Sequence, residues 1–377
     1  MTLDLAQEFP QAPEIAYLNH AAVAPWPKRA GDALIDFARQ NVEEGARHYP
    51  RWLEVETQLR RQLAQLINAP SPNDIALVKN TSEALSMVAW GLSWKAGDEI
   101  VISDQEFPSN RIVWESLARQ GVKVVAATLD EDDPEGAVEA CLSPRTKLVS
   151  ISAVQYGTGL RLDLKRLGNA CRERGILFCV DAIQSIGAEP MDVQALPIDF
   201  TMADGHKWML GAEGLCLFYV RPELRNSLQL HEYGWHMVKQ RGDFDRKDWE
   251  PAEDALRFEC GSPNMLGIYT LQASTSLLLE VGLEEIRAGI ADRLSWLETL
   301  LTPLPGYRQI TPADPERRSG IFTFRLEGHD SATLYQELMN RGVVCAYRGG
   351  GVRFSPHFYT PPAVIETAAR TLTQLIT

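Results

Sequence analysis

Short β-prone runs alternate with longer helical patterns between about residues 75 and 220, and this alternation limits the possible folds more than any other feature. The intervening patterns, such as Ser109–Gln120 and Leu164–Arg174, are long enough to form crossover helices. The alternation predicts an α/β fold with a mostly parallel, seven-stranded sheet covered by helices on both faces. After a strand that ends near Val78, the predicted strands are Glu99–Ser103, Lys123–Thr128, Lys147–Val154, Ile176–Asp181, Phe200–Ala203 and Gly214–Val220.

The length and the later part of the chain predict a second domain. A chain of 377 residues is longer than one hydrophobic core usually serves. Strand runs at Gly320–Leu326 and Gly342–Ala346 flank a helical pattern at Ala332–Asn340, which is an α+β arrangement. We therefore predict a large domain over residues 17–255, a smaller α+β domain over 256–377, and an N-terminal segment, 1–16, that packs with the smaller domain.

Charge and cysteine usage exclude several classes of function. The net charge of −13 opposes binding to phosphate backbones and anionic membranes, and no Lys/Arg run forms a basic patch. Six scattered cysteines without a CxxC pair are typical of a reduced cytoplasmic protein without a metal site. The first residues lack the pattern of a signal peptide. We expect a cytoplasmic protein whose partner is a small molecule, with no nucleic acid or membrane partner.

Two ionisable residues follow neighbouring predicted strands. Asp181 ends one strand, and His206-Lys207 follow the next. Ligands of such sheets bind beyond the carboxyl ends of the strands, so the carboxylate and the amine should meet there. A pyridoxal phosphate enzyme needs this pair, because lysine forms a Schiff base and an acid keeps the pyridine nitrogen protonated. The plainer alternative is an exposed lysine at a strand end.

Two further motifs fit such a cofactor. Thr81-Ser82 stand where a strand meets an apolar helical pattern; either residue would cap the helix, whose first N–H groups would bind an anion. Phe107, held by Pro108, would stack on a planar ring. The alternatives are an ordinary helix cap and a core phenylalanine beside a turn.

In their order and spacing, these motifs resemble the class V aminotransferases of fold-type I. This family of pyridoxal phosphate enzymes includes cysteine desulfurases, selenocysteine lyase, kynureninase and isopenicillin N epimerase. The resemblance covers nearly the whole chain, from Tyr17–Ala22 to Arg353–Tyr359. It implies pyridoxal 5'-phosphate as the cofactor, a small amino acid as the substrate, and a homodimer whose active sites are shared across the interface.

The resemblance also implies a role for individual residues. Lys207 would be the catalytic residue, which binds the cofactor covalently and then moves the α-proton of the substrate. Asp181 would pair with the ring nitrogen, and Gln184 would donate to the ring hydroxyl. The implied cofactor-binding residues are Thr81, Ser82, Phe107, Asp181, Gln184, His206, Lys207 and, from the neighbouring subunit, Ser262. The implied substrate-binding residues are Arg353, which would grip the carboxylate, and His20, Tyr156 and Trp235.

Departures from the family pattern bear on the reaction. Cysteine desulfurases carry a nucleophilic cysteine on a loop shortly before the carboxylate-binding arginine. Here the segment from Cys345 to Arg353 is too short for that loop, and Cys345 lies within a predicted strand. We therefore expect transamination or lyase chemistry without a cysteine nucleophile, on a small amino acid held as an external aldimine. The alternatives are desulfurase- or selenocysteine lyase-like cleavage of a C–S or C–Se bond and, more remotely, a pyridoxal-binding protein without catalysis.

Three other positions qualify the resemblance. Asp204 stands where a small serine is common, so one phosphate-binding hydroxyl is expected to be missing. Tyr156 is open to two interpretations, an acid/base group or a wall of the pocket. No helical pattern follows Gly349–Gly351, so we expect a flexible loop over the substrate there and no phosphate loop.

Overall fold

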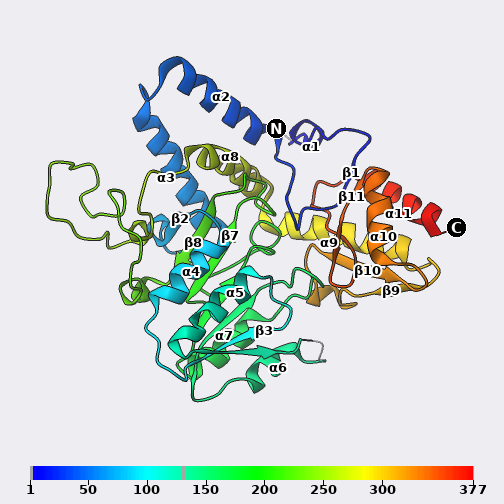
Figure 1. The fold of residues 1–377 in the computed structure, drawn as a ribbon. Coiled ribbons are helices and arrows are strands. Elements are labelled where there is room, and N and C mark those ends of the chain that lie inside the picture. Colours follow the sequence, from blue (N-terminus) through cyan, green and yellow to red (C-terminus); the bar gives the residue numbers. More distant parts are fainter. Residues whose placement is uncertain (1–2, 130–131, 377) are drawn as a thin grey trace.

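A seven-stranded sheet forms the centre of the computed structural model, which describes residues 3–129 and 132–376 (Figure 1). The strand order is β2-β8-β7-β6-β5-β3-β4, in which β8 runs antiparallel to both neighbours and the other neighbouring pairs are parallel. The predicted mostly parallel sheet is thus confirmed. Its strands are β2 Ile75–Val78, β3 Glu99–Ser103, β4 Lys123–Ala127, β5 Thr146–Ser152, β6 Leu177–Asp181, β7 Phe200–Asp204 and β8 Cys216–Val220.

Helices cover both faces of this sheet because successive side chains of a strand point to opposite faces. In β6, Phe178 and Val180 join an apolar cluster that includes side chains of α3, α6 and α7. Cys179 joins a second cluster with two helices on the other face. The helices of the first face are α3 Tyr49–Leu66, α6 Pro134–Ala140 and α7 Leu164–Glu173, and those of the second face are α4 Thr81–Gly91 and α5 Ser109–Glu115.

Helix α8, Met265–Val281, packs along α3 and along α2, Lys28–Glu44, at the upper left of Figure 1. It therefore lies against helices of the large domain, although the predicted boundary at residue 256 assigns it to the smaller one. The division into domains at 256 stays a prediction.

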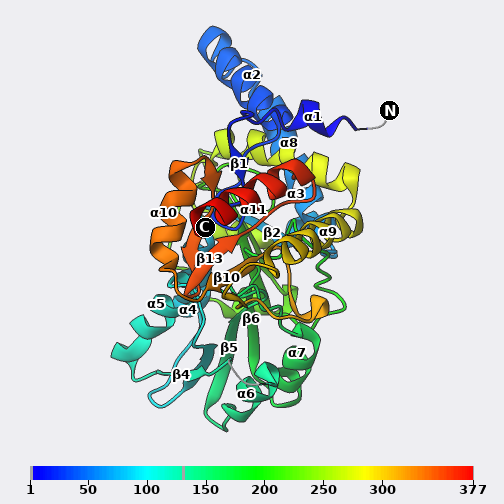
Figure 2. The same cartoon turned by 90° about the vertical axis from the view of Figure 1, so that its right-hand side faces the viewer.

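The C-terminal part is a four-stranded antiparallel sheet with three helices (Figure 2). The strand order is β12-β13-β10-β9. The short strand β1, Ala16–Tyr17, runs parallel to β11, Val343–Val344, and so joins the N-terminal segment to this part. The other elements are β9 Tyr307–Gln309, β10 Phe322–Leu326, β12 Ala346–Arg348, β13 Gly351–Phe354, α9 Leu283–Leu301, α10 Ser331–Asn340 and α11 Pro362–Ile376, and the N-terminus adds α1 Leu5–Glu8.

The predicted flexible loop at Gly349–Gly351 is instead a tight hairpin turn. Arg348 pairs with Gly351 across the β12–β13 ladder, which leaves only Gly349 and Gly350 in the turn. Their φ angles of 58° and 78° lie in the left-handed region, where glycine carries no steric cost. The three glycines therefore serve a two-residue turn and the start of β13.

None of the described helices is both long and apolar enough to span a membrane.

Candidate active site

A cavity of about 270 Å³ opens beyond the carboxyl ends of β6 and β7. It is bounded by the segment 21–23, the start of α4, the segment after β3, the turn after β7 and the hairpin β12–β13. Of the predicted site residues, the structure brings together around it Thr81, Ser82, Phe107, Tyr156, Asp181, Gln184, His206, Lys207 and Arg353.

Asp181 and Lys207 form the charged centre of the cavity. Asp181, the last residue of β6, is 2% exposed, and its Oδ1 accepts a hydrogen bond from the Ile183 N–H at 3.1 Å. Burial raises the pKa of Asp181 to about 7, and the charge of Glu106 adds to the rise while that of Lys207 opposes it. Burial likewise lowers the pKa of Lys207 to about 8, against the opposing influence of Asp181. Among the described residues, no carboxylate lies within ion-pair distance of Lys207 Nζ.

The start of α4 offers an anion site of the predicted kind with a different cap. Asn80 is the N-cap: its Oδ1 accepts a hydrogen bond from the Glu83 N–H at 2.9 Å, a role that the sequence assigned to Thr81 or Ser82. Asparagine is among the strongest N-caps, which explains the correction. The hydroxyl groups of Thr81 and Ser82 are therefore not used as caps, and both residues line the cavity. The first N–H groups of the helix point toward any anion there.

Asp204 and His206 stand beside this helix start. Asp204 Oδ1 lies 2.8 Å from His206 Nδ1, and the Asp204 N–H donates to Thr81 Oγ1 at 3.3 Å. The carboxylate at the position where a serine is common thus faces the histidine. The two atoms are close but make no hydrogen bond, and His206 lines the cavity.

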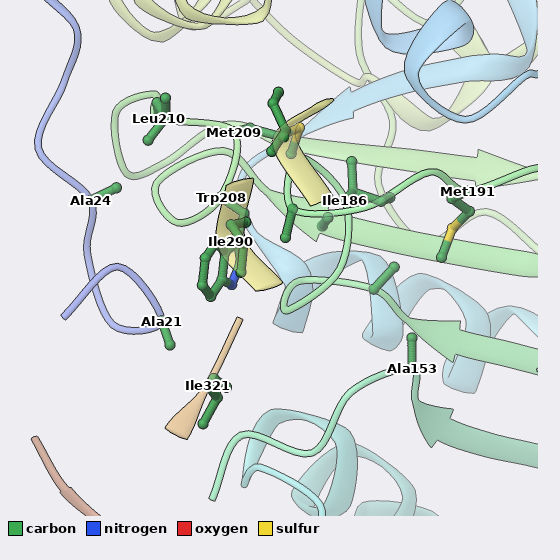
Figure 3. Close-up of a cluster of buried hydrophobic side chains, with 14 of the residues drawn as sticks. Ala21, Ala24, Ala153, Ile186, Met191, Trp208, Met209, Leu210, Ile290 and Ile321 are labelled. Atoms are coloured by element: carbon green, nitrogen blue, oxygen red, sulfur yellow. The ribbon is translucent and has the colours of Figure 1, made fainter. Parts of the chain in front are cut away.

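The side chain of Gln184 is held from two sides. Its Nε2 donates to the Ala21 carbonyl at 3.0 Å, and its Oε1 accepts from Trp208 Nε1 at 2.8 Å. An amide nitrogen carries two hydrogens, so one N–H of Gln184 remains for a ligand. Trp208, next to Lys207, is itself fixed in a buried apolar cluster with Ile290 and Ile321 (Figure 3). A Cβ on Gly320 would lie 2.2 Å from Trp208 Cη2, so only glycine admits the indole there.

Phe107 and Tyr156 form an aromatic wall. Phe107 is 41% exposed, and its ring meets that of Tyr156 edge-on with centroids 5.2 Å apart. Lys207 Nζ lies 5.6 Å from the centroid of the Phe107 ring. The Phe107 ring is therefore close to the amine, where a bound planar group would stack on it.

Arg353, on β13, carries a guanidinium that lacks an anionic partner among the described residues. It is 2% exposed, its Nη1 donates to the Tyr156 carbonyl at 2.8 Å, and its Nη2 donates to Asn19 Oδ1 at 3.4 Å. Its buried Nε has no hydrogen-bond partner. Burial lowers the pKa of Arg353 to about 10. A buried cation with free donors is costly unless a ligand supplies the negative charge.

Three predicted site residues lie away from this cavity. His20 is fully buried: its Nδ1 lies 2.8 Å from the Ser355 carbonyl oxygen and its Nε2 lies 2.7 Å from Tyr359 Oη. Burial lowers the pKa of His20 to about 4. Because both ring nitrogens are used inside the protein, the expectation that His20 binds substrate is corrected to a structural role.

Trp235 lines a separate cavity of about 400 Å³ with Phe244 and Trp249, in the long segment between β8 and α8. The single chain therefore does not bring it to the substrate. Ser262 lies in another surface cavity, with Lys79 and Asn264. Its role toward a neighbouring subunit stays a prediction.

The sequence interpretation missed several residues at or behind the cavity. Arg348 and Glu213 line it. Glu106 lies behind it, buried and bonded to the ends of two strands. The sequence did hold a signal for Glu106. It directly precedes Phe107 at a strand end, and a carboxylate buried at such a position needs hydrogen-bond partners because burial without them is costly.

None of the cysteines in the described part of the chain lines the cavity. Cys345 lies between β11 and β12 and is 2% exposed, and burial raises its pKa to about 12. The segment Gly342–Ala346, predicted as one strand, is divided at this residue.

These features fit pyridoxal phosphate. The cavity joins an amine of lowered pKa, a buried acid, an aromatic ring and a helix N-terminus, which match the aldehyde, ring nitrogen, ring face and phosphate of that group. The free donors of Arg353 add a site for a carboxylate.

Comparisons with known proteins agree over nearly the whole chain. The family model described as Aminotransferase class-V matches residues 16–355. A "Probable cysteine desulfurase" of Methanothermobacter thermautotrophicus is 29% identical, with 99% of this chain and 98% of that protein covered. Isopenicillin N epimerase of Streptomyces clavuligerus is 30% identical, with 96% of this chain and 95% of that protein covered. The solved structure of the cystine C–S lyase C-DES with its product cysteine persulfide is 25% identical with a TM-score of 0.90, covering 97% of this chain and 99% of the other.

Proposed function

Because the chain belongs to the class V aminotransferase family, we propose that it cleaves the C–S bond of a cysteine-type amino acid. The chain is a pyridoxal phosphate-dependent enzyme of fold-type I, as its sequence indicated. The substrate and the bond that breaks are the proposal.

The expectation of transamination, or of lyase chemistry without a cysteine nucleophile, is wrong. Similar proteins are named as cysteine desulfurases, and a similar solved structure is that of a cystine C–S lyase with cysteine persulfide. They favour the alternative that the sequence left open, cleavage at sulfur.

One observation carries the proposal: Lys207, Asp181 and Arg353 meet at one cavity with charges that the protein leaves uncompensated. The cofactor, when bound, would supply an electron sink at the α-carbon of the substrate, which is the chemistry that cleavage of the C–S bond requires. The residues of the chain must then hold the amino acid, take the proton and keep the ring charge in place.

Lys207 is suited to the proton transfer. Its pKa is lowered to about 8, so the neutral amine that a base requires is far more accessible near neutral pH than for an ordinary lysine. We propose that Nζ takes the α-proton. Asp181, buried with a raised pKa, would accept the N–H of the cofactor ring, and that contact would in turn favour its ionised form.

Arg353 would fix the orientation of the substrate. Its planar guanidinium offers two parallel N–H groups to an α-carboxylate, and binding would satisfy the free Nε. The Tyr156 carbonyl, which accepts from Nη1, would hold the guanidinium in place.

We also propose a homodimer with shared sites in a cytoplasmic setting. Two observations support the dimer: the 41% exposed Phe107 borders the cavity, and Ser262 lines a different cavity of its own chain. The six free cysteines and the net charge of −13 support the setting.

The experiment mixes purified holoprotein with L-cysteine, L-cystine and L-selenocysteine, and with L-alanine and L-serine as controls without sulfur. Sulfide or sulfane sulfur should appear together with alanine or pyruvate, and Lys207→Ala should produce neither. Conversion of the cofactor to its pyridoxamine form by the amino acids, with no sulfur released from any of them, would overturn the proposal.

A further inference from the structure

Glu106 is a buried carboxylate with an unusually complete set of hydrogen-bond donors. It is 7% exposed and lies just beyond the end of β3. Its two oxygens accept from Ser103 Oγ at 2.7 Å, Asn110 Nδ2 at 2.9 Å, the Ser152 N–H at 3.0 Å and Gln155 Nε2 at 3.2 Å, and also from the Ser152 hydroxyl. These partners join the ends of β3 and β5 to helix α5.

The surroundings are built for an anion. The orientation of the Asn110 amide is fixed because its Oδ1 accepts from Trp114 Nε1 at 2.9 Å and from Ser150 Oγ at 2.6 Å. Its Nδ2 must therefore be the atom that donates to Glu106. A neutral glutamine in place of Glu106 would turn an NH₂ group toward these donors.

Glu106 and Asp181 are both linked to the end of strand β5. Ser152 donates to Glu106 and is the direct partner of Asp181 in the β5–β6 register. The Ala153 N–H donates to the Asp181 carbonyl at 2.9 Å. Two buried carboxylates thus lie on the two sides of one strand end.

The other titratable groups around Asp181 do not cancel this charge. Lys207 is the cation that acts on Asp181. The thiols of Cys179 and Cys216 also interact electrostatically with Asp181. Burial raises the pKa of both thiols, so they stay neutral. Without a ligand, two like charges face one amine that burial disfavours as a cation.

We propose that Glu106 is a positioning residue that holds a second negative charge behind Asp181 and so keeps the proton on the ring nitrogen of the bound cofactor. The proposal rests on the pairing of Asp181 with that nitrogen. A protonated ring adds the positive charge that Asp181 and Glu106 together favour, and charges in a dry site act more strongly than in water. The same hydrogen bonds fix the segments that carry Phe107 and Tyr156, the next residues after Glu106 and Gln155.

The test follows the ring nitrogen directly. Holoprotein is prepared with ¹⁵N-labelled pyridoxal phosphate, and the nitrogen chemical shift is recorded against pH for the wild type, Glu106→Gln and Glu106→Asp. In Glu106→Gln, which lacks the charge, the nitrogen should lose its proton at a pH lower by about 1 unit. Glu106→Asp keeps the charge and should stay close to the wild type.

Equal behaviour of all three proteins, or an equal shift in both variants, would overturn the proposal, because the effect would then not follow the charge. If Glu106→Gln does not fold, the double variant Glu106→Gln/Asn110→Ser replaces the Nδ2 donor that faces the new amide by a hydroxyl that can accept from it, and this variant should show the same shift. Failure of both to fold would assign Glu106 to fold stability alone. No amino acid substrate is used, so this result is independent of whether C–S cleavage is found.

Discussion

Two clusters of buried charged residues in this protein differ in whether their charges are paired with opposite charges. In the first, the Arg60 cluster, Arg60 Nη2 lies 2.6 Å from Glu56 Oε1, and Arg60 Nη1 lies 2.6 Å from Glu259 Oε1. Arg60 also donates to the Ile75 carbonyl at 2.8 Å, and Glu259 accepts from the Leu77 N–H at 2.8 Å. The cluster thus joins helix α3 to strand β2, with its charges paired.

The second cluster consists of Asp181, Lys207 and Arg353, and the described residues supply no comparable ion pairs for it. The pKa of Asp181 is raised and that of Lys207 is lowered, which are the signs of burial without adequate compensation. The contrast separates charges that hold elements together from charges kept for a ligand.

Paired charges can also resemble a ligand site. Glu56, Glu259 and His236 have ligand atoms within 4.8 Å of one another, as in a metal centre. Arg60, however, binds both carboxylates, and Arg241 Nη1 lies 2.6 Å from His236 Nε2. The guanidinium groups stand where a cation would be needed.

The largest expected effect is that of Lys207→Ala. Loss of the amine should remove the visible absorbance of the lysine-linked cofactor and lower kcat by about 10²–10⁴-fold, because the base is gone. Absorbance spectra and assays of sulfur release measure both effects. A variant that keeps the lysine-linked absorbance would contradict the assignment of Lys207.

The matched substitution in the other cluster is Arg60→Ala. It leaves the buried Glu259 without its arginine partner and Glu56 with only Arg241, 3.9 Å away, and should lower the free energy of unfolding by about 3–5 kcal/mol. Urea unfolding of the apo-proteins measures this, with Lys207→Ala as the control that should cost no stability. If Lys207→Ala were as destabilising as Arg60→Ala, the distinction between the two clusters would fail.

Arg353→Lys should raise KM for the amino acid by about 10–100-fold, with a smaller change in kcat. Lysine keeps the charge but loses the paired N–H groups that suit a carboxylate. Steady-state kinetics with an unchanged cofactor spectrum would locate the effect on the substrate side. An unchanged KM would place the carboxylate elsewhere.

The uncompensated pair should give the apo-protein a minimum of stability between pH 7 and 8. The pKa of Asp181 is about 7 in the folded protein and 3.8 in the unfolded chain, so folding favours its protonated form. The stability that this adds is fully present below pH 3.8 and is lost as the pH rises through about 7. The pKa of Lys207 is about 8 in the folded protein and 10.5 in the unfolded chain, so folding disfavours its charged form. The resulting loss of stability is fully present below pH 8 and disappears as the pH rises toward 10.5.

The expected dip is on the order of 1–2 kcal/mol. Unfolding of the wild type and of Asp181→Asn/Lys207→Met at pH 5, 7.5 and 9.5 tests it. The double variant should show a flatter profile, and a dip of equal depth in both proteins would trace it to other groups.

Ser262→Ala should have the smallest effect. If its hydroxyl binds the phosphate in a neighbouring subunit, its loss should weaken cofactor affinity by about 3–10-fold. Equilibrium dialysis against pyridoxal phosphate measures this, and pyridoxal without phosphate should bind both proteins equally. Unchanged affinity for both ligands would separate Ser262 from the shared site.

Much of the site could be predicted because its residues stand at strand ends, which periodicity locates. Asp181 ends β6, and Lys207 follows β7, within a residue or two of the predicted positions. His20, by contrast, belongs to a motif near the N-terminus, and its hydrogen bonds to Ser355 and Tyr359 cross almost the whole chain. Such pairings leave no periodic signal, so its structural role could not be predicted.

The sequence by itself determined the alternating α/β architecture, the cofactor and the residues at the strand ends, because apolar periodicity and turn residues act over a few neighbours. Only the tertiary structure decided which buried charges are paired. Arg60 on α3 pairs with Glu259, whereas Arg353 pairs with no acid among the described residues. The charge of Glu106 acts on Asp181 from the other side of the end of β5. Burial and distance set the free energy of a charge, and both arise only when segments far apart in the chain come together.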